Sequence, residues 1–320
     1  MSSSSDAPYP RLVGDVGGTQ ARFGWVGRAG DEVGHVAAYP GDDYPGLAAV
    51  IHHYLAEQSR PAPASCAIGV AGAVVGERVE LTNRNWSVSA ADLKREFGLE
   101  RMVLLNDFAA LAFALPTLQP DELVRVGGGA GLPGAPLALL GAGTGLGVSG
   151  LLAQGSVPVT GEGGHVSLCA EDDEQDQILS ILRGWFGRVS AERALSGPGL
   201  VNLHRASCIV ASRPDTVLEP RDVIERALDG SDAQCVEAVE LFFAFLGSVA
   251  GDLALTLGAR GGVYVGGGIV PRLGDWIGRS TFRRRFEAKG RFASYLADIP
   301  VWVISATESP ALRGADRALD

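Results

Sequence analysis

The feature of this chain that most constrains its fold is a pattern that occurs twice, in which two apolar runs flank a glycine-rich turn. Short apolar runs that border glycines are typical of buried strands joined by a tight turn. Each copy therefore predicts a β-hairpin with an unusual tip, one near the N-terminus and one about a domain later in the chain. The first copy comprises Leu12–Val13, Gly14–Gln20 and Ala21–Val26, and the second comprises Leu137–Leu140, Gly141–Gly147 and Val148–Leu152.

Between and after the two hairpins, runs with strand character alternate with runs that have apolar residues at helical spacing. This alternation favours an α/β fold with a mixed sheet. The expected strands are Ser65–Val70, Arg78–Thr82, Val103–Leu105, Gly262–Val265 and Pro300–Ile304. The expected helices are one that starts at Pro45, one from Ser89 to near Gly98, and Gln175–Phe186, Ala191–Ala206, Pro220–Leu228 and Ala233–Leu257.

A chain of 320 residues is longer than one hydrophobic core usually supports, which predicts two domains. We expect a flexible tail over residues 1–10 and a small α/β domain over 11–115, to which a C-terminal segment near 305–320 could be added. A large α/β domain with helical insertions is expected over 116–304.

Composition excludes several classes of protein. The chain is 46% hydrophobic and 20% charged, which indicates a globular protein rather than a disordered one. Its formal net charge of −10 disfavours a nucleic-acid or membrane-surface partner, because both require a basic face. Residues 1–10 lack the features of a signal peptide, so a cytoplasmic location is expected. The uncharged stretch Ala135–Gln154 contains five glycines, and we interpret it as strands and a turn rather than a membrane span.

The cysteines indicate neither a zinc site nor a disulfide framework. Cys66, Cys169, Cys208 and Cys235 are far apart in the sequence and form no CxxC pair, which fits reduced thiols. The basic run Arg283–Arg285 is interpreted as a solvated helix face rather than a binding patch.

The turn of the first hairpin is suited to an anion, because glycines let backbone N–H groups approach phosphate oxygens. Asp15 would repel phosphate by its charge, so its presence suggests a bridging Mg²⁺ that is held partly through water. The alternative is a plain turn in which Asp15 caps its own backbone. The candidate phosphate-binding residues here are Gly14, Asp15, Val16, Gly17, Gly18 and Thr19.

The second turn fits neither common nucleotide motif. Its register does not give GxGxxG, and no GKS or GKT tripeptide of a Walker A loop occurs in the chain. Two glycine hairpins with a threonine near each tip could instead clamp a triphosphate from both sides, with Gly143, Thr144 and Gly145 contributing from the second. A third cluster, Gly266, Gly267 and Gly268, ends a predicted strand and could accept adenosine, although a plain strand-to-helix turn would look similar.

With these motifs in view, the chain resembles the bacterial glucokinase family of the hexokinase and actin-like ATPase superfamily, from Leu12 to about Leu319. The resemblance implies an actin-like (ribonuclease H-like) fold of two domains with a mixed sheet in each and a cleft between them, which binds glucose, ATP and Mg²⁺ and often forms a homodimer. The matching segments are LVGDVGGT (12–19), LTNRNW (81–86), NDF (106–108), GAGTGLG (141–147), GEGGHVSL (161–168), SAERALSGPGLVNLHRA (190–206) and GGVYVGGGIVPR (262–272).

Carried over by position, the resemblance implies that Asp107 is the catalytic base for the 6-hydroxyl of glucose. A carboxylate can accept that proton as the oxygen attacks the γ-phosphorus, although Asp107 could also cap the helix that follows. The implied sugar ligands are Asn106, Asp107, Glu162, His165 and Glu192.

Two alternatives stay open at this point. The chain could phosphorylate another hexose or use another phosphoryl donor, because glycine loops recognise phosphate better than adenine. A sugar-sensing regulator is disfavoured, since only about ten residues precede the first strand. One departure from the family pattern is Arg313 in the segment Pro310–Gly314, where the family tends to have leucine, and this puts the adenosine-side packing in doubt.

Overall fold

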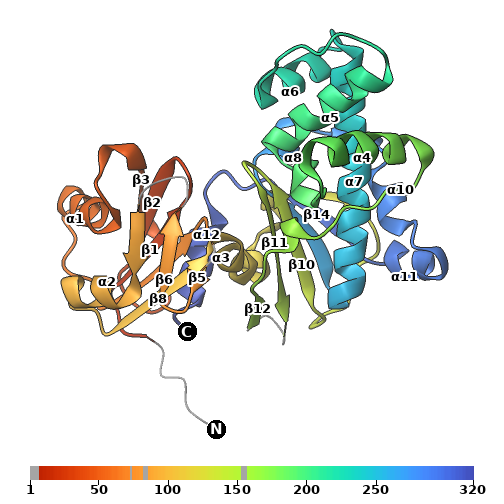
Figure 1. The fold of residues 1–320 in the computed structure, drawn as a ribbon. Coiled ribbons are helices and arrows are strands. Elements are labelled where there is room, and N and C mark those ends of the chain that lie inside the picture. Colours follow the sequence, from red (N-terminus) through yellow and green to blue (C-terminus); the bar gives the residue numbers. More distant parts are fainter. Residues whose placement is uncertain (1–6, 73, 82–85, 153–156) are drawn as a thin grey trace. The chain divides into compact units, whose positions relative to one another are not determined.

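The computed structural model describes residues 7–72, 74–81, 86–152 and 157–320, and the chain forms two compact units (Figure 1). The first unit comprises Met1–Gln119, Gly155–Thr160 and Ala306–Asp320, and the second comprises Pro120–Gln154 and Gly161–Ser305. Both contain sheets and helices, so the predicted α/β class with mixed sheets is confirmed.

The first unit is built on a five-stranded sheet in the order β3-β2-β1-β4-β8. Strands β1 and β2 form the predicted antiparallel hairpin, and β1, β4 and β8 are parallel to one another. Alternating and continuous apolar runs explain the burial of the sheet, with β4 buried at every residue. The strands are β1 (Arg11–Val16), β2 (Gln20–Val26), β3 (Gly34–Pro40), β4 (Ser65–Val70) and β8 (Arg101–Asn106), with a separate sheet of β5 (Val74–Val75), β6 (Arg78–Leu81) and β7 (Trp86–Ser89).

The helices of the first unit begin and end at recognisable signals. Ser89 caps α2 by accepting a hydrogen bond from the backbone N–H of Asp92, and Gly98 ends that helix in the left-handed conformation. The last helix, α12, packs against α3 and β1. The helices are α1 (Leu47–Glu57), α2 (Ala90–Phe97), α3 (Asp107–Ala114) and α12 (Pro310–Arg317).

The expectation of a flexible tail over 1–10 is wrong for residues 7–10, while residues 1–6 lie outside the described part of the chain. Ala7 is buried, and its N–H donates to the carbonyl of Leu319 over 3.2 Å. The fully buried Arg11 donates to the Ala7 carbonyl and pairs with Asp316 and Asp320 at 3.0 and 2.8 Å. A buried guanidinium needs such partners, and they fix this segment against the C-terminus.

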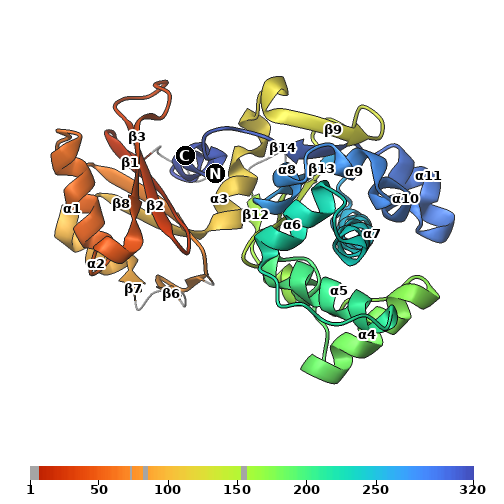
Figure 2. The ribbon, with the colours of Figure 1, turned by 90° about the horizontal axis from the view of Figure 1, so that it is seen from above.

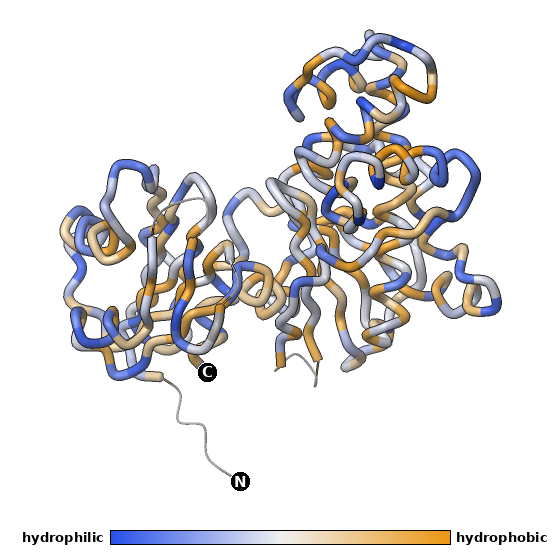
Figure 3. The backbone as a smooth tube through the Cα atoms, in the orientation of Figure 1, coloured by the Kyte–Doolittle hydropathy of each residue, from blue (hydrophilic) through white to orange (hydrophobic). Residues whose placement is uncertain are grey.

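The second unit repeats the core of the first. In its sheet the strands lie in the order β11-β10-β13-β14-β9; β10 and β11 form the second predicted hairpin, and β10, β13 and β14 are parallel. In this unit the hairpin is therefore followed in the sheet by two parallel strands, β13 and β14. In the first unit the hairpin β2-β1 is followed in the same way by β4 and β8. The strands are β9 (Leu123–Gly127), β10 (Leu137–Ala142), β11 (Leu146–Leu152), β13 (Gly262–Gly266) and β14 (Val301–Ile304). The short strand β12 (Val157–Val159) lies in the segment Gly155–Thr160 of the first unit. Figure 3 shows hydrophobic and hydrophilic stretches interspersed along the backbone, with hydrophilic colour on several outer loops.

Helices of the second unit cover its sheet (Figures 1 and 2). The predicted helix Ala191–Ala206 is wrong at its start, because a short 3₁₀ turn, Ala191–Arg193, precedes a helix that begins only at Gly197. Ser196 provides the N-cap of that helix, and Pro198 stands in its first turn, where it costs no hydrogen bond. The helices are α4 (Asp173–Phe186), α5 (Gly197–Val210), α6 (Pro220–Leu228), α7 (Ala233–Leu257), α8 (Ile269–Arg272), α9 (Trp276–Arg279), α10 (Phe282–Glu287) and α11 (Ala293–Ala297).

Helix α7 is long and apolar enough to cross a membrane by composition, but 72% of its most apolar window is buried inside the protein. That degree of burial is typical of a core helix. The run Arg283–Arg285 in α10 is not a uniformly solvated face, which corrects the sequence-based interpretation. Arg285 is largely covered and pairs with Glu171 and Asp172.

Candidate functional site

The junction of β8 and α3 positions the first pair of predicted site residues. Asn106 is the N-cap of α3, and its Oδ1 accepts hydrogen bonds from the N–H groups of Phe108 at 2.9 Å and Ala109 at 3.4 Å. Its Nδ2 donates to the carbonyl of Gly72 over 3.2 Å. The capping role considered for Asp107 therefore falls mainly to Asn106, which frees Asp107 to be the first residue of the helix.

Asp107 is half-buried at this helix N-terminus, and its Oδ1 also accepts from the N–H of Phe108 at 2.9 Å. Sequence reasoning missed Gly69, which lets α3 approach the sheet. A Cβ at Gly69 would lie 2.9 Å from the Cβ of Ala110 and 3.5 Å from the Cα of Asp107. A side chain there would displace the first turn of α3, so Gly69 helps to fix Asp107.

The glycine turn of the first hairpin is shorter than expected. Gly14, Asp15 and Val16 belong to β1 and pair with β2, so only residues 17–19 form the tip, closed by the N–H of Gly17 on the Gln20 carbonyl at 2.9 Å. The ladder extends to the pair Val16 and Ala21, both of which are fully buried in the core. These three residues are therefore not part of the turn, and Val16 has a core side chain.

Asp15 lies in a small polar network inside the first unit. Its Oδ2 accepts a hydrogen bond from Ser309 Oγ at 2.6 Å and pairs with Arg22 Nη1 at 3.3 Å. Arg22 faces Asp15 across the hairpin because the register places them opposite each other. Neither partner was predicted from the sequence: the hairpin register could have indicated Arg22, whereas no local signal points to Ser309.

In the second unit, the structure brings Glu192 and His165 together. Glu192 Oε1 lies 4.0 Å from His165 Nδ1, and Glu192 Oε2 accepts a hydrogen bond from the backbone N–H of Leu146 at 2.9 Å. The imidazole is 56% exposed and the Glu192 side chain 33% exposed, so both can reach a ligand. Glu162 is exposed, and its carbonyl accepts the N–H of His165 at 3.0 Å.

The tip of the second hairpin is Gly143–Gly145, with Thr144 exposed, so the three predicted residues do form the turn. The carbonyl of Gly143 accepts the N–H of Gly197 at 2.8 Å, which ties the tip to the start of α5. At Gly145 a Cβ would collide with Glu192 Oε2. Glycine at this position therefore makes room for the carboxylate.

The third glycine cluster has a clear packing role. A Cβ on Gly141 would lie 2.6 Å from the carbonyl carbon of Gly266, so the parallel strands β10 and β13 meet at bare backbone. Gly267 has a φ of +80° and approaches the backbone of Ala142, whereas a Cβ at Gly268 would meet open space. Gly267 and Gly268 are exposed after the strand end. This geometry explains Gly141 and Gly267 without a ligand.

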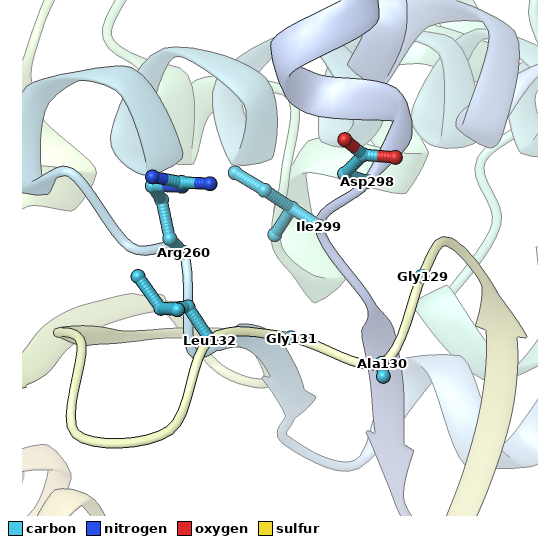
Figure 4. Close-up of a pocket in the computed structure, with 7 residues that line it drawn as sticks. All are labelled: Gly129, Ala130, Gly131, Leu132, Arg260, Asp298 and Ile299. Atoms are coloured by element: carbon cyan, nitrogen blue, oxygen red, sulfur yellow. The ribbon is translucent and has the colours of Figure 1, made fainter.

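Arg313, the departure from the family pattern, packs within the first unit. Its guanidinium donates to the carbonyl of Thr117 at 3.2 Å, just after α3. A separate pocket of about 190 Å³ in the second unit contains none of the predicted site residues. Figure 4 shows its lining, which is Gly129, Ala130, Gly131, Leu132, Arg260, Asp298 and Ile299.

Comparisons with known proteins agree along the whole chain. The family model described as Glucokinase matches residues 12–320. A glucokinase of Aromatoleum aromaticum is 50% identical over 100% of this chain and 97% of its own length. A glucokinase of Chromobacterium violaceum is 49% identical over 98% of this chain and 90% of its own. The crystal structure of a glucokinase from an Antarctic psychrotroph superposes with a TM-score of 0.89 at 34% identity, covering 97% of this chain and 98% of its own.

Proposed function

Because the chain belongs to the glucokinase family, we propose that it transfers the γ-phosphoryl group of ATP to the 6-hydroxyl of D-glucose, giving glucose 6-phosphate and ADP. The observation that carries this proposal is the β8–α3 junction. There Asn106 caps the helix, and the Asp107 carboxylate stands at its first residue. Such a carboxylate is suited to accept a hydroxyl proton.

In the proposed mechanism, Asp107 accepts the proton of the 6-hydroxyl as that oxygen attacks the γ-phosphorus in line with the leaving ADP. The positive end of the α3 dipole favours the ionised carboxylate that this step needs. General base assistance of this kind contributes about 10²- to 10⁴-fold to the rate. Gly69 and Asn106 act as positioning residues for Asp107 through the helix start.

We propose that the sugar hydroxyls are bound by Glu162, His165, Glu192 and Asn106. Glu192 is oriented by the Leu146 N–H through Oε2, which leaves Oε1 to accept a hydroxyl. An imidazole can donate and accept, as vicinal hydroxyls require. Asn106 uses Oδ1 for the cap and one Nδ2 hydrogen on Gly72, so its second Nδ2 hydrogen is the group suited to the sugar.

The glycine turns are proposed to bind the triphosphate through backbone N–H groups at the hairpin tips, residues 17–19 and 143–145. Gly266, Gly267 and Gly268 would approach the adenosine. The donor set fits a water-mediated Mg²⁺, because Asp15 Oδ1 has no partner among the described residues while Oδ2 is held by Ser309 and Arg22. Bound Mg²⁺ would neutralise phosphate charge, and Asp15 would hold its water shell.

An actin-like ATPase fold and a homodimer rest on the family resemblance and are part of this proposal. A cytoplasmic location without a nucleic-acid or membrane partner is also part of it, and it rests on the sequence features of the chain. The net charge of −10 supports the last point, since nucleic acids and anionic membranes attract basic surfaces.

The proposal is tested by a coupled assay of glucose 6-phosphate formation with the purified protein, ATP, Mg²⁺ and glucose. Mannose, fructose and N-acetylglucosamine serve as competing acceptors, and other nucleoside triphosphates as competing donors. Asp107→Asn should lower kcat by at least about 10²-fold while glucose still binds by calorimetry. A matched control is Asp92→Asn, in the exposed first turn of α2. Selective activity with another sugar or donor, or a kcat for Asp107→Asn within tenfold of the parent, would contradict it.

A further inference from the structure

A cluster of potential metal ligands lies inside the second unit, away from every residue assigned above. His204 and Cys208 are one turn apart on α5, and Asp232 and Cys235 stand at the N-terminus of α7. Residues four apart share a helix face, so both α5 side chains point the same way. The helices α5, α6 and α7 pack together (Figures 1 and 2).

The donor atoms are close enough to share one ion. One ligand atom each of His204, Asp232 and Cys235 lie within 4.8 Å of one another. Within this group, His204 Nε2 is 3.9 Å from Asp232 Oδ2. A fourth donor, Cys208 Sγ, is 3.6 Å from the same nitrogen. Ligands of tetrahedral zinc, bound at about 2.0–2.3 Å, are separated by roughly 3.3–3.8 Å, so His204, Asp232 and Cys235 would have to draw together slightly to bind one ion, with Cys208 as a further donor beside His204.

The burial of His204 is poorly explained by packing alone. Its side chain is 1% exposed, and Nδ1 has no hydrogen-bond partner among the described residues. The nearest neighbour of Nε2 is the Cys208 thiol, which is a weak hydrogen-bonding group. An unsatisfied buried polar group costs about 1–3 kcal/mol. Coordination by Nε2, the nitrogen that faces Asp232 and Cys208, would give the imidazole one strong partner.

The surrounding charges are compatible with a cation but do not replace it. Arg226 on α6 lies 3.9 Å from Asp232 Oδ2, and Asp215 adds a negative charge from the loop before α6.

We propose that His204, Asp232, Cys235 and Cys208 form a structural site for a divalent transition-metal ion, with Zn²⁺ the best match to this nitrogen, oxygen and sulfur donor set. The sequence spacing of the cysteines gave no sign of it, because the ligands come from two helices. The ion would join α5 to the start of α7 across α6. On binding, each ligating thiol loses its proton to solvent and becomes a thiolate.

The first test uses the full chain without sugar or nucleotide, so its result is independent of the proposed kinase activity. The protein is stripped with a chelator and titrated with Co²⁺, whose thiolate complexes absorb in the visible and near ultraviolet. We expect saturation at about one equivalent with a thiolate-to-cobalt band, reversed by Zn²⁺ but not by excess Mg²⁺. The absence of this band in the wild-type protein would overturn the proposal.

Variants then assign the ligands. Cys235→Ser and His204→Asn should each reduce bound Zn²⁺ at least tenfold by elemental analysis, whereas Cys66→Ser, a buried cysteine of the first unit, should bind it like the parent. Zn²⁺ should also raise the thermal midpoint of the stripped wild-type protein, a readout that needs no variant. Equal Zn²⁺ content in Cys235→Ser and the parent, or no shift of the midpoint, would contradict the site.

Discussion

The hydroxyl of Ser309 donates a 2.6 Å hydrogen bond to Oδ2 of Asp15, which joins a residue just before the last helix to the first strand. Ser309 precedes α12 but makes no capping hydrogen bond with it. The hydroxyl is therefore committed to Asp15. Together with Arg22, it fixes the one carboxylate that we propose to hold the water shell of Mg²⁺.

We predict that Ser309→Ala weakens the apparent binding of Mg²⁺ and ATP by about fivefold, equivalent to about 1 kcal/mol, because Asp15 loses one of its two anchors. The measurement is KM for ATP over a series of Mg²⁺ concentrations. Ser309→Thr keeps the hydroxyl, so its KM for ATP should be close to that of the parent. A change in KM for glucose instead of ATP would argue against a role through Asp15.

We predict that Gly145→Ala raises KM for glucose by about tenfold, because its Cβ would displace the Glu192 carboxylate from the Leu146 N–H and a charge-assisted hydrogen bond is worth about 1.5–3 kcal/mol. Steady-state kinetics at saturating ATP would measure this. The matched variant is Gly143→Ala, where a Cβ meets open space, and its KM for glucose should rise less. An equal increase of KM for glucose in both variants would show that displacement of Glu192 is not its cause.

A third prediction concerns alkaline stability. Burial raises the pKa of Tyr54 to about 12, and its hydroxyl donates to the His35 carbonyl at 3.0 Å. The folded state thus keeps a proton that the unfolded chain loses near pH 10, so this stability is complete below pH 10 and is lost as pH rises towards 12. The free energy of unfolding of Tyr54→Phe should therefore fall less steeply above pH 10.

Urea unfolding at pH 8, 10 and 11 would test this. The slope difference between parent and variant should approach about 1.4 kcal/mol per pH unit. Tyr295→Phe, at a half-buried tyrosine of the second unit, controls for the general loss of lysine and tyrosine protons. Parallel pH profiles for Tyr54→Phe and the parent would contradict the assignment.

Much of the local structure followed from the sequence because its signals are local. The strand Ser65–Val70 and the helices Pro220–Leu228 and Ala233–Leu257 have the predicted bounds, since each has clear periodicity and a turn or cap at its ends. Errors occurred where two signals competed. The helix expected from Ala191 begins at Gly197, because Ser196 and Pro198 favour a new N-terminus over continued periodicity.

The sequence by itself determined the two hairpins, the mixed α/β class and the order of the site motifs, because these depend on residue type and short-range spacing. Only the tertiary structure decided that Asn106 caps α3, that Ser309 and Arg22 hold Asp15, and that His204 and Cys235 meet between two helices. The physical reason is that hydrogen bonds and ion pairs form between atoms close in space. Strand register and helix packing set that proximity, and neither can be read from neighbours along the chain.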